Sequence, residues 1–94
     1  MTLAGSARPR LARKARLRFD AREDKNVLLS PERGLVLNET AASVLGLCDG
    51  IRTIDAIVDA LAAGHAPGER ARIAGDVMDL LERLVSRTVI ELAP

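Results

Sequence analysis

Aromatic residues are almost absent from this chain of 94 residues, which has Phe19 and no Trp or Tyr. Proteins that bind single-stranded nucleic acid commonly stack its bases on aromatic side chains, so the composition disfavours that class. Hydrophobic residues make up 48% of the chain, enough for one core, yet no apolar run is long enough to span a membrane. The basic N-terminus is not followed by the apolar segment of a secretory signal. We therefore expect a cytoplasmic protein with no membrane partner.

Cysteine and histidine occur once each, and this scarcity excludes several kinds of chemistry. Cys48 cannot form an internal disulfide, and its place in an apolar helical pattern predicts a small buried side chain. His65 lies in a Pro- and Gly-containing loop, and nothing in the pattern supplies the partners of a catalytic triad. One Cys and one His cannot complete a zinc site, and calcium-loop spacing and glycine-rich phosphate-binding motifs are missing. The sequence thus predicts no catalytic residue, no metal and no cofactor, in a protein that is not an enzyme.

The charges are unevenly divided along the chain. All 13 Asp and Glu follow residue 19, whereas six of the 14 Lys and Arg precede it: Arg8, Arg10, Arg13, Lys14, Arg16 and Arg18. Residues 1–15 also lack clear periodicity and contain Pro and Gly, which predicts a flexible basic arm, followed by a single domain over residues 16–94. A basic arm on an acidic body suits an acidic partner or a nucleic acid.

The first half of the domain has the periodicity of short strands. Apolar and polar residues alternate over Arg16–Asp20, which is typical of a half-buried strand. Val27–Leu29 and Leu35–Leu37 are short apolar runs, and the residues between them, including Pro31 and Gly34, favour a turn. Three strands joined by short connections predict an antiparallel meander.

Helical spacing begins at Asn38, which is a preferred N-cap. Apolar residues then recur with helical spacing until Asp49–Gly50, where Gly suits the end of a helix. Thr53 can cap a second helix, and a longer third helix begins near Glu69. Val89–Leu92 alternates weakly, as in a last short strand or a docked tail. The sequence predicts an α+β fold in which a three-stranded N-terminal meander is followed by three helices that cover one face of the sheet.

Three helices after basic residues also allow a winged-helix nucleic-acid-binding protein as an alternative. The second predicted helix argues against it, because it carries Asp55 and Asp59 and no Lys or Arg. Carboxylates on a helix that enters the major groove are repelled by phosphates. Another possibility follows from the meander: an extended peptide can add to the edge strand Leu35–Leu37, using its backbone for affinity and its side chains for specificity.

Several blocks of the chain resemble the PqqD family of pyrroloquinoline quinone (PQQ) biosynthesis. Leu28-Leu29-Ser30-Pro31-Glu32-Arg33 is followed by Leu37-Asn38-Glu39-Thr40-Ala41 and by Val44-Leu45, Leu47-Cys48-Asp49-Gly50 and Arg52-Thr53. Arg16–Asp20 and Ile57–Leu61 fit the family as well. Together these blocks extend the resemblance over roughly residues 8–92.

The resemblance implies a peptide chaperone rather than an enzyme. PqqD-like proteins bind the precursor peptide PqqA and present it to the radical SAM enzyme PqqE, and their fold is a winged-helix-like recognition element. The motif residues have structural roles: Pro31 and Glu32 set a turn, Asn38 caps a helix, and Asp49–Gly50 ends one. The family's strongest signals are therefore expected to mark the scaffold.

By the same resemblance the peptide adds beside the third strand and packs against the third helix. Carried over by element, the peptide-binding residues are Leu35, Val36, Leu37, Arg72, Asp76, Asp79, Leu80 and Arg83. An exposed strand edge also predicts a monomer that is able to form a strand-swapped dimer. A structural subunit of a larger enzyme is a further hypothesis, and the role of the basic arm stays open.

Overall fold

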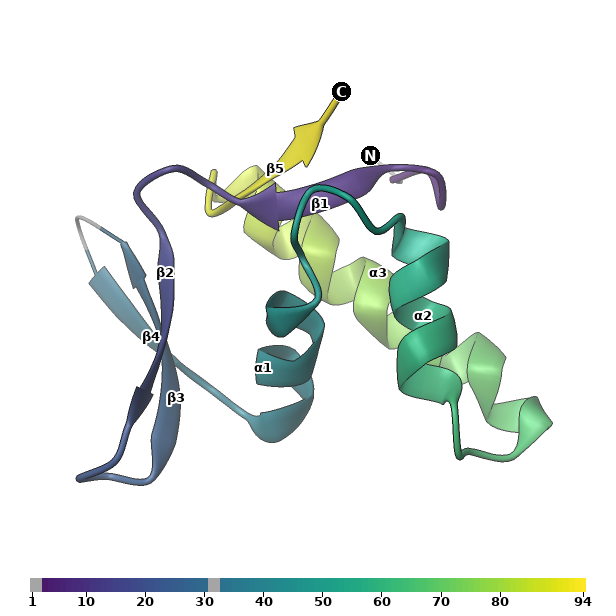
Figure 1. The fold of residues 1–94 in the computed structure, drawn as a ribbon, viewed down its shortest axis with the longest axis horizontal. Coiled ribbons are helices and arrows are strands. Elements are labelled where there is room, and N and C mark those ends of the chain that lie inside the picture. Colours follow the sequence, from purple (N-terminus) through teal and green to yellow (C-terminus); the bar gives the residue numbers. More distant parts are fainter. Residues whose placement is uncertain (1–2, 31–32) are drawn as a thin grey trace.

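The computed structural model describes residues 3–30 and 33–94. Strands and helices follow the predicted order, with one additional strand at the N-terminal end and a short C-terminal strand where the weak alternation over Val89–Leu92 allowed one (Figure 1). The elements are β1 (Arg8–Leu11), β2 (Arg16–Asp20), β3 (Lys25–Ser30), β4 (Arg33–Leu37), α1 (Glu39–Gly46), α2 (Ile54–Ala62), the short 3-10 helix η1 (Pro67–Glu69), α3 (Arg70–Ser86) and β5 (Ile90–Ala93).

The predicted meander is confirmed: β2, β3 and β4 form an antiparallel sheet in the order β2-β3-β4. Leu17 pairs with Leu28, and Leu28 pairs with Leu35. Directly paired residues share one face of a sheet, so these three leucines lie on the same side. Leu28 is only 3% exposed, which identifies this side as the core-facing one. Pro31 and Glu32, which the sequence predicts to set a turn, lie outside the described residues.

Two of the three helices begin at the caps that the sequence predicts. The Asn38 side chain accepts a hydrogen bond from the Ala41 N–H at 2.7 Å, and Thr53 Oγ1 accepts one from the Ala56 N–H at 3.1 Å. Each bond satisfies a backbone donor that has no partner within its helix. The apolar faces of α1, α2 and α3 then meet in one core, where α2 packs against α3.

The prediction that Asp49–Gly50 ends the first helix is wrong by about one turn, because α1 ends at Gly46 with Leu47 as its C-cap. Asp49 instead organises the connection to α2: Oδ1 accepts hydrogen bonds from the Ile51 and Arg52 N–H groups at 2.9 and 2.8 Å. Gly50 does adopt a positive φ, of 77°. Its N–H donates to the Pro9 carbonyl at 2.9 Å, so the glycine joins this connection to β1.

The N-terminal segment differs from the flexible arm that the sequence predicts over residues 1–15. Its residues 8–11 form β1, which pairs antiparallel with β5 from Arg8↔Ala93 to Leu11↔Ile90. Leu3 is 5% exposed and Pro9 is fully buried. The partner of β1 lies at the far end of the sequence, and local periodicity carries no information about such a pairing. The residues near the C-terminus that alternate weakly form β5, which is the second strand of this two-stranded sheet.

The core is entirely apolar, since the structure buries no polar or charged residue among those it describes. Ile57 and Leu81 lie at its centre with 0% exposure, and Cys48 is 7% exposed. The expected burial of Cys48 is thus confirmed. Burial raises the pKa of its thiol to about 12, and the neighbouring Asp49 charge acts in the same direction. Among the described residues, no helix is both long and apolar enough to cross a membrane.

Removing residues 1–11 tests whether β1 belongs to the folded unit. The free energy of unfolding should fall by at least about 3 kcal/mol, because two buried side chains, Leu3 and Pro9, are lost and each contributes roughly 1.5–3 kcal/mol. Urea denaturation followed by circular dichroism measures this. Full-length Arg8→Gln, which changes one exposed side chain and keeps β1, should unfold at the wild-type midpoint. A truncated chain as stable as the full chain would instead support a flexible arm.

Candidate functional site

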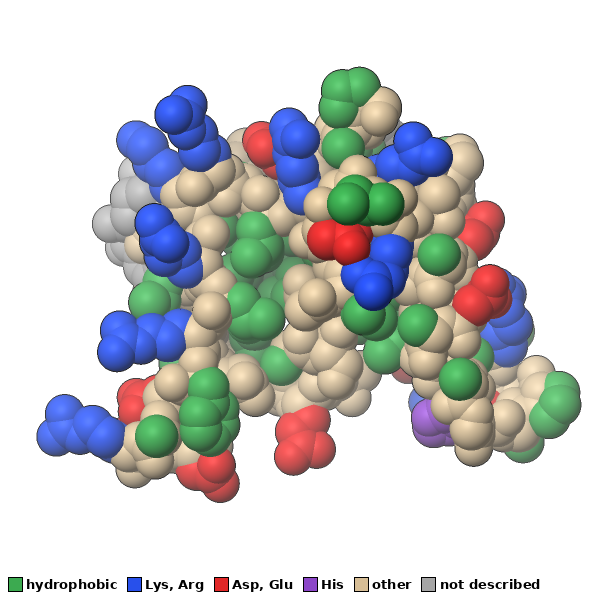
Figure 2. All heavy atoms as spheres, viewed as in Figure 1, with side chains coloured by type: hydrophobic (Ala, Val, Ile, Leu, Met, Phe, Trp, Pro, Cys, Tyr) green, Lys and Arg blue, Asp and Glu red, His purple; other side chains and the backbone are tan. Residues whose placement is uncertain are grey.

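A groove of about 710 Å³ lies between the three-stranded sheet and the C-terminal end of α3. Leu28, Ser30 and Leu35 line it from the sheet, and Leu84 lines it from α3. The remaining lining residues belong to two connections, residues 12–15 between β1 and β2 and residues 87–89 between α3 and β5. Figure 2 shows hydrophobic side chains inside a hollow between the sheet and the helices. The groove therefore combines an apolar floor with walls from both ends of the chain.

The end of α3 gives the groove one well-defined wall. The Thr88 N–H donates to the Val85 carbonyl, and the Val89 N–H donates to the Leu84 carbonyl, each at 3.0 Å. This pair of bonds is a Schellman motif, and it requires the left-handed conformation at Thr88, whose φ is 57°. A β-branched residue rarely adopts this conformation, and outliers of this kind cluster at functional sites.

The wall formed by residues 12–15 is tied to the end of α3. The Ala12 N–H donates to the Val89 carbonyl at 2.8 Å, and the Ala15 N–H donates to the Ala12 carbonyl at 2.9 Å. The first bond extends the β1–β5 pairing by one step, and the second closes a turn before β2. Both walls are thus held by backbone hydrogen bonds.

The outer edge of β4 has no partner strand among the described residues. Ser30 pairs with Arg33 across only two residues, and such a closing pair is hydrogen-bonded. Hydrogen-bonded and non-hydrogen-bonded pairs alternate along an antiparallel ladder, so Val27↔Val36, the third pair after Ser30↔Arg33, belongs to the non-hydrogen-bonded type. The N–H and C=O groups of Val36 therefore point away from β3, toward the open edge. They are available to an added strand beside the groove.

The structure separates the three predicted residues of β4. Leu35 is 38% exposed and lines the groove. Val36 is 59% exposed on the opposite face of the sheet, so its backbone rather than its side chain is available to a strand at the edge. Leu37 is buried in the core, where it packs on the core-facing side of the sheet. Whether these residues bind a peptide stays a prediction.

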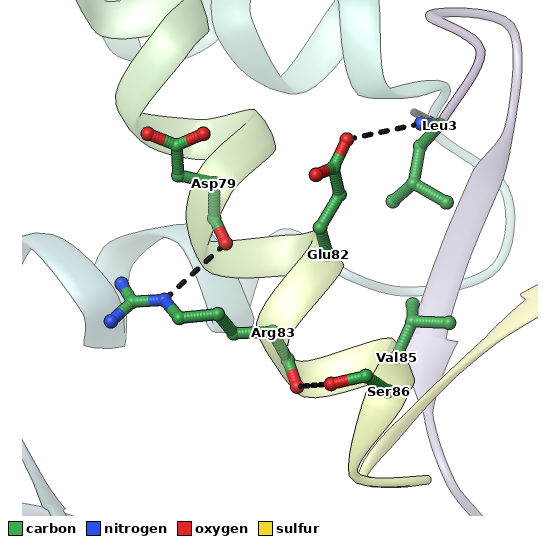
Figure 3. Close-up of a pocket in the computed structure, with 6 residues that line it drawn as sticks. All are labelled: Leu3, Asp79, Glu82, Arg83, Val85 and Ser86. Carbon is green, nitrogen blue, oxygen red and sulfur yellow. Dashed lines mark hydrogen bonds between the residues drawn. The ribbon is translucent and has the colours of Figure 1, made fainter. Parts of the chain in front are cut away.

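The five predicted residues of α3 do not line this groove. Arg72 and Asp76 are exposed and lie near one another, with Nη1 and Oδ2 3.8 Å apart, and Leu80 is half-buried against the core. Asp79 and Arg83 line a second pocket together with Leu3, Glu82, Val85 and Ser86 (Figure 3). The structure thus places Leu35 and the predicted α3 residues in different surroundings.

Three polar side chains of the second pocket, those of Glu82, Arg83 and Ser86, already have hydrogen-bond partners. Glu82 Oε1 accepts a hydrogen bond from the Leu3 N–H at 3.3 Å, and Ser86 Oγ donates to the Arg83 carbonyl at 2.7 Å. Arg83 Nε donates to the Asp79 carbonyl at 3.4 Å. Figure 3 shows these bonds running along α3 and across to Leu3. This pocket holds the N-terminal segment against the helix, and the groove is the better candidate site.

Sequence reasoning missed most of the groove. The helical spacing of apolar residues predicts Leu84 only as a core residue of the third helix, and the charge pattern predicts Arg13 and Lys14 only as part of an arm. Arg87 and Thr88 carried no signal of their own. The pairing of β1 with β5 is what brings these residues together, so no spacing within either segment could have revealed them.

Two carboxylates outside the groove have lowered pKa values. The pKa of Asp49 is lowered chiefly by the Arg52 and Ile51 N–H groups that it accepts. That of Glu69 is lowered chiefly by the hydrogen bond with His65, whose Nδ1 lies 3.0 Å from Glu69 Oε2. Both carboxylates are at the surface, and each stabilises a local turn. In the part of the chain that the structure describes, no cluster of His, Cys, Asp and Glu could hold a metal.

Comparison with known proteins identifies close relatives. The family model for coenzyme PQQ synthesis protein D (PqqD) matches residues 25–90. A PqqA binding protein of Rhodopseudomonas palustris is 40% identical over 87 residues, which cover 93% of this chain and 84% of the relative. A bifunctional coenzyme PQQ synthesis protein C/D of Methylorubrum extorquens is 40% identical over 88 residues, which cover 94% of this chain and 23% of that larger protein.

A solved structure shares both sequence and fold with this chain. It is the solution NMR structure of the PqqD truncation of Methylobacterium extorquens PqqCD, with 40% identity and a TM-score of 0.78. The match covers 95% of this chain and 94% of the solved one. That truncation is described as a functional, stand-alone recognition element for ribosomally synthesised and post-translationally modified peptides.

Thr88→Gly tests the strained backbone that shapes the groove wall. Glycine adopts a positive φ freely, so the variant should be more stable by about 0.5–1 kcal/mol after allowance for the greater freedom of glycine in the unfolded chain. Urea denaturation provides the comparison. Thr88→Val removes the hydroxyl and keeps β-branching, so it should bring no gain. Equal stability of the Gly and Val variants would contradict the assigned strain.

Proposed function

The chain belongs to the PqqD family, and on this premise we propose that it is a recognition element that binds the precursor peptide PqqA in PQQ biosynthesis. Relatives at about 40% identity bear the name PqqA binding protein. The single observation that carries the proposal is the open edge of β4 beside an apolar groove, with α3 as the opposite wall.

Strand addition is the binding mode that suits this geometry. An extended peptide at the β4 edge would receive backbone hydrogen bonds from Val36, and every second side chain would face the same side of the sheet as Leu35. These side chains would enter the groove above Leu28 and Leu84. Affinity would come from the backbone and the apolar floor, and specificity from the lining side chains.

The same proposal makes this protein a carrier of substrate rather than a catalyst. Its one buried thiol is held in the neutral form, because its pKa of about 12 lies far above physiological pH, and its one histidine is engaged with Glu69 at the surface. Chemistry on the peptide would therefore belong to a partner. We propose the radical SAM enzyme PqqE as the protein to which the bound peptide is presented.

Calorimetric titration of this chain with PqqA tests the proposed function directly. A saturable one-site isotherm is expected, accompanied by NMR shifts of the β4 and α3 amides. Adding PqqE should give a ternary complex that elutes as one species. A titration without heat and without spectral shifts, both with and without PqqE, would refute peptide binding by this protein.

Val36→Pro tests the strand-addition mode separately. Proline removes the N–H that points to the open edge, so the Kd for PqqA should rise about ten-fold, the equivalent of one lost hydrogen bond in a shielded ladder. Because Val36 does not bond to β3, the variant should still fold, which circular dichroism checks. Val36→Ala keeps the N–H and is the matched control, with a Kd close to that of the wild type. Unchanged affinity in folded Val36→Pro would disprove strand addition at this edge.

A further inference from the structure

Three cationic side chains line the groove: Arg13 and Lys14 from the connection between β1 and β2, and Arg87 from the C-cap of α3. None of the three forms an ion pair with another described residue. Outside the groove, Arg10, Lys25, Arg52, Arg70 and Arg72 have acidic partners within 4 Å, whereas Arg8, Arg16, Arg18, Arg22 and Arg83 form no ion pair with a described residue. The groove thus presents positive charge that the rest of the described chain leaves uncompensated.

Among the residues that the structure describes, no acidic one lines the groove. The second pocket, at the neighbouring part of α3, contrasts with it, because Asp79 and Glu82 lie there beside Arg83. Figure 2 shows Lys and Arg side chains gathered over the sheet and the segment that leads into it. The described lining of the groove therefore presents charge of a single sign to a ligand.

The cations surround an apolar floor. Leu28 and Leu84 are each 3% exposed at the bottom of the groove, and Leu35 is the more exposed leucine beside them. A bound chain that covers these leucines also excludes water from the charged rim. Ion pairs are stronger in such partly desolvated surroundings than on an open surface.

Backbone hydrogen bonds fix the positions from which these cationic side chains extend. Arg87 is fixed by the Schellman motif at the end of α3, and residues 12–15 are fixed by the bonds Ala12 N–H to Val89 O and Ala15 N–H to Ala12 O. Binding at these positions therefore has to order the side chains but not the backbone that carries them, which lowers the entropy cost.

We propose that the groove selects peptide segments that carry an acidic side chain next to apolar ones, with Arg13, Lys14 and Arg87 as the residues that determine this specificity. The inference rests on the proposed function, since it describes the same groove with PqqA as its occupant. A carboxylate at the rim pairs with these cations while the neighbouring apolar side chains cover the leucines. Nucleic acid fits less well, because the groove has no aromatic side chain on which a base could stack.

The test compares two peptides and two variants by calorimetry. The peptides are PqqA and a version in which every Asp and Glu is replaced by Asn and Gln. Arg13→Gln/Arg87→Gln should bind PqqA about ten-fold more weakly than the wild type, at about three- to five-fold for each lost ion pair. It should bind the neutral peptide as the wild type does. Raising the ionic strength from about 0.01 to 0.15 M should weaken wild-type binding of PqqA more than that of the variant.

The matched control removes two cations from the other end of the sheet. Arg22→Gln/Lys25→Gln changes the net charge equally at the turn between β2 and β3, far from Ser30 and Ala15 at the groove, and its Kd for PqqA should stay within about two-fold of the wild type. Circular dichroism confirms that both double variants fold. An equal loss in the control would show that net charge, and not the groove, attracts the peptide, and would overturn the proposal.

Other outcomes separate this inference from the proposed function. If wild-type protein binds PqqA and the neutral peptide equally, the charge selectivity is refuted while peptide binding stands. If the wild type binds neither peptide, both proposals fall. A single-stranded oligonucleotide that binds more tightly than PqqA, and loses affinity in Arg13→Gln/Arg87→Gln, would replace the peptide as the ligand of these cations and overturn the inference.

Discussion

The pairing of the two ends of the chain is the constraint on which the rest of this structure depends. β1 and β5 align from Arg8↔Ala93 to Leu11↔Ile90, and three further backbone bonds continue from this pair. The Gly50 N–H reaches Pro9 and the Ile54 N–H reaches Ala7, which positions the start of α2, while the Ala12 N–H reaches Val89 at the end of α3. One short strand pair thereby fixes the positions of the start of α2, the end of α3 and the connection that leads into β2 relative to one another.

The groove is a direct consequence of that arrangement. Its walls come from residues 12–15 and 87–89, which are separated by most of the chain and joined by the terminal strands. The apolar floor requires no residues of a special kind, because Leu28 and Leu84 are ordinary core residues that also form the base of the groove. The proposed peptide binding depends on the place where no other part of the described chain covers these core residues. The surface in this way combines an open strand edge at β4 with a shaped apolar floor.

The motif residues and the groove residues have different tasks. Asn38 and Thr53 cap helices, and Asp49 and Gly50 hold the connection between α1 and α2 against β1. These signals identify the family because the frame requires particular side chains or a positive φ at fixed places. The groove requires only apolar residues and cations in suitable positions, so its residues, such as Leu35 and Arg87, are inconspicuous in the chain.

The sequence by itself determined the meander, the caps at Asn38 and Thr53 and the burial of Cys48, because each depends on contacts within a few residues or on hydrophobic periodicity. Local signals predicted the end of α1 less accurately, because they placed it at Asp49, about one turn beyond its actual end at Gly46. Asp49 instead accepts hydrogen bonds from the backbone amides that follow it. Only the tertiary structure decided that residues 8–11 form a strand and that α3 contributes its last turn to the groove. Both depend on hydrogen bonds between the two ends of the chain, and no pattern within either end encodes the identity of its partner.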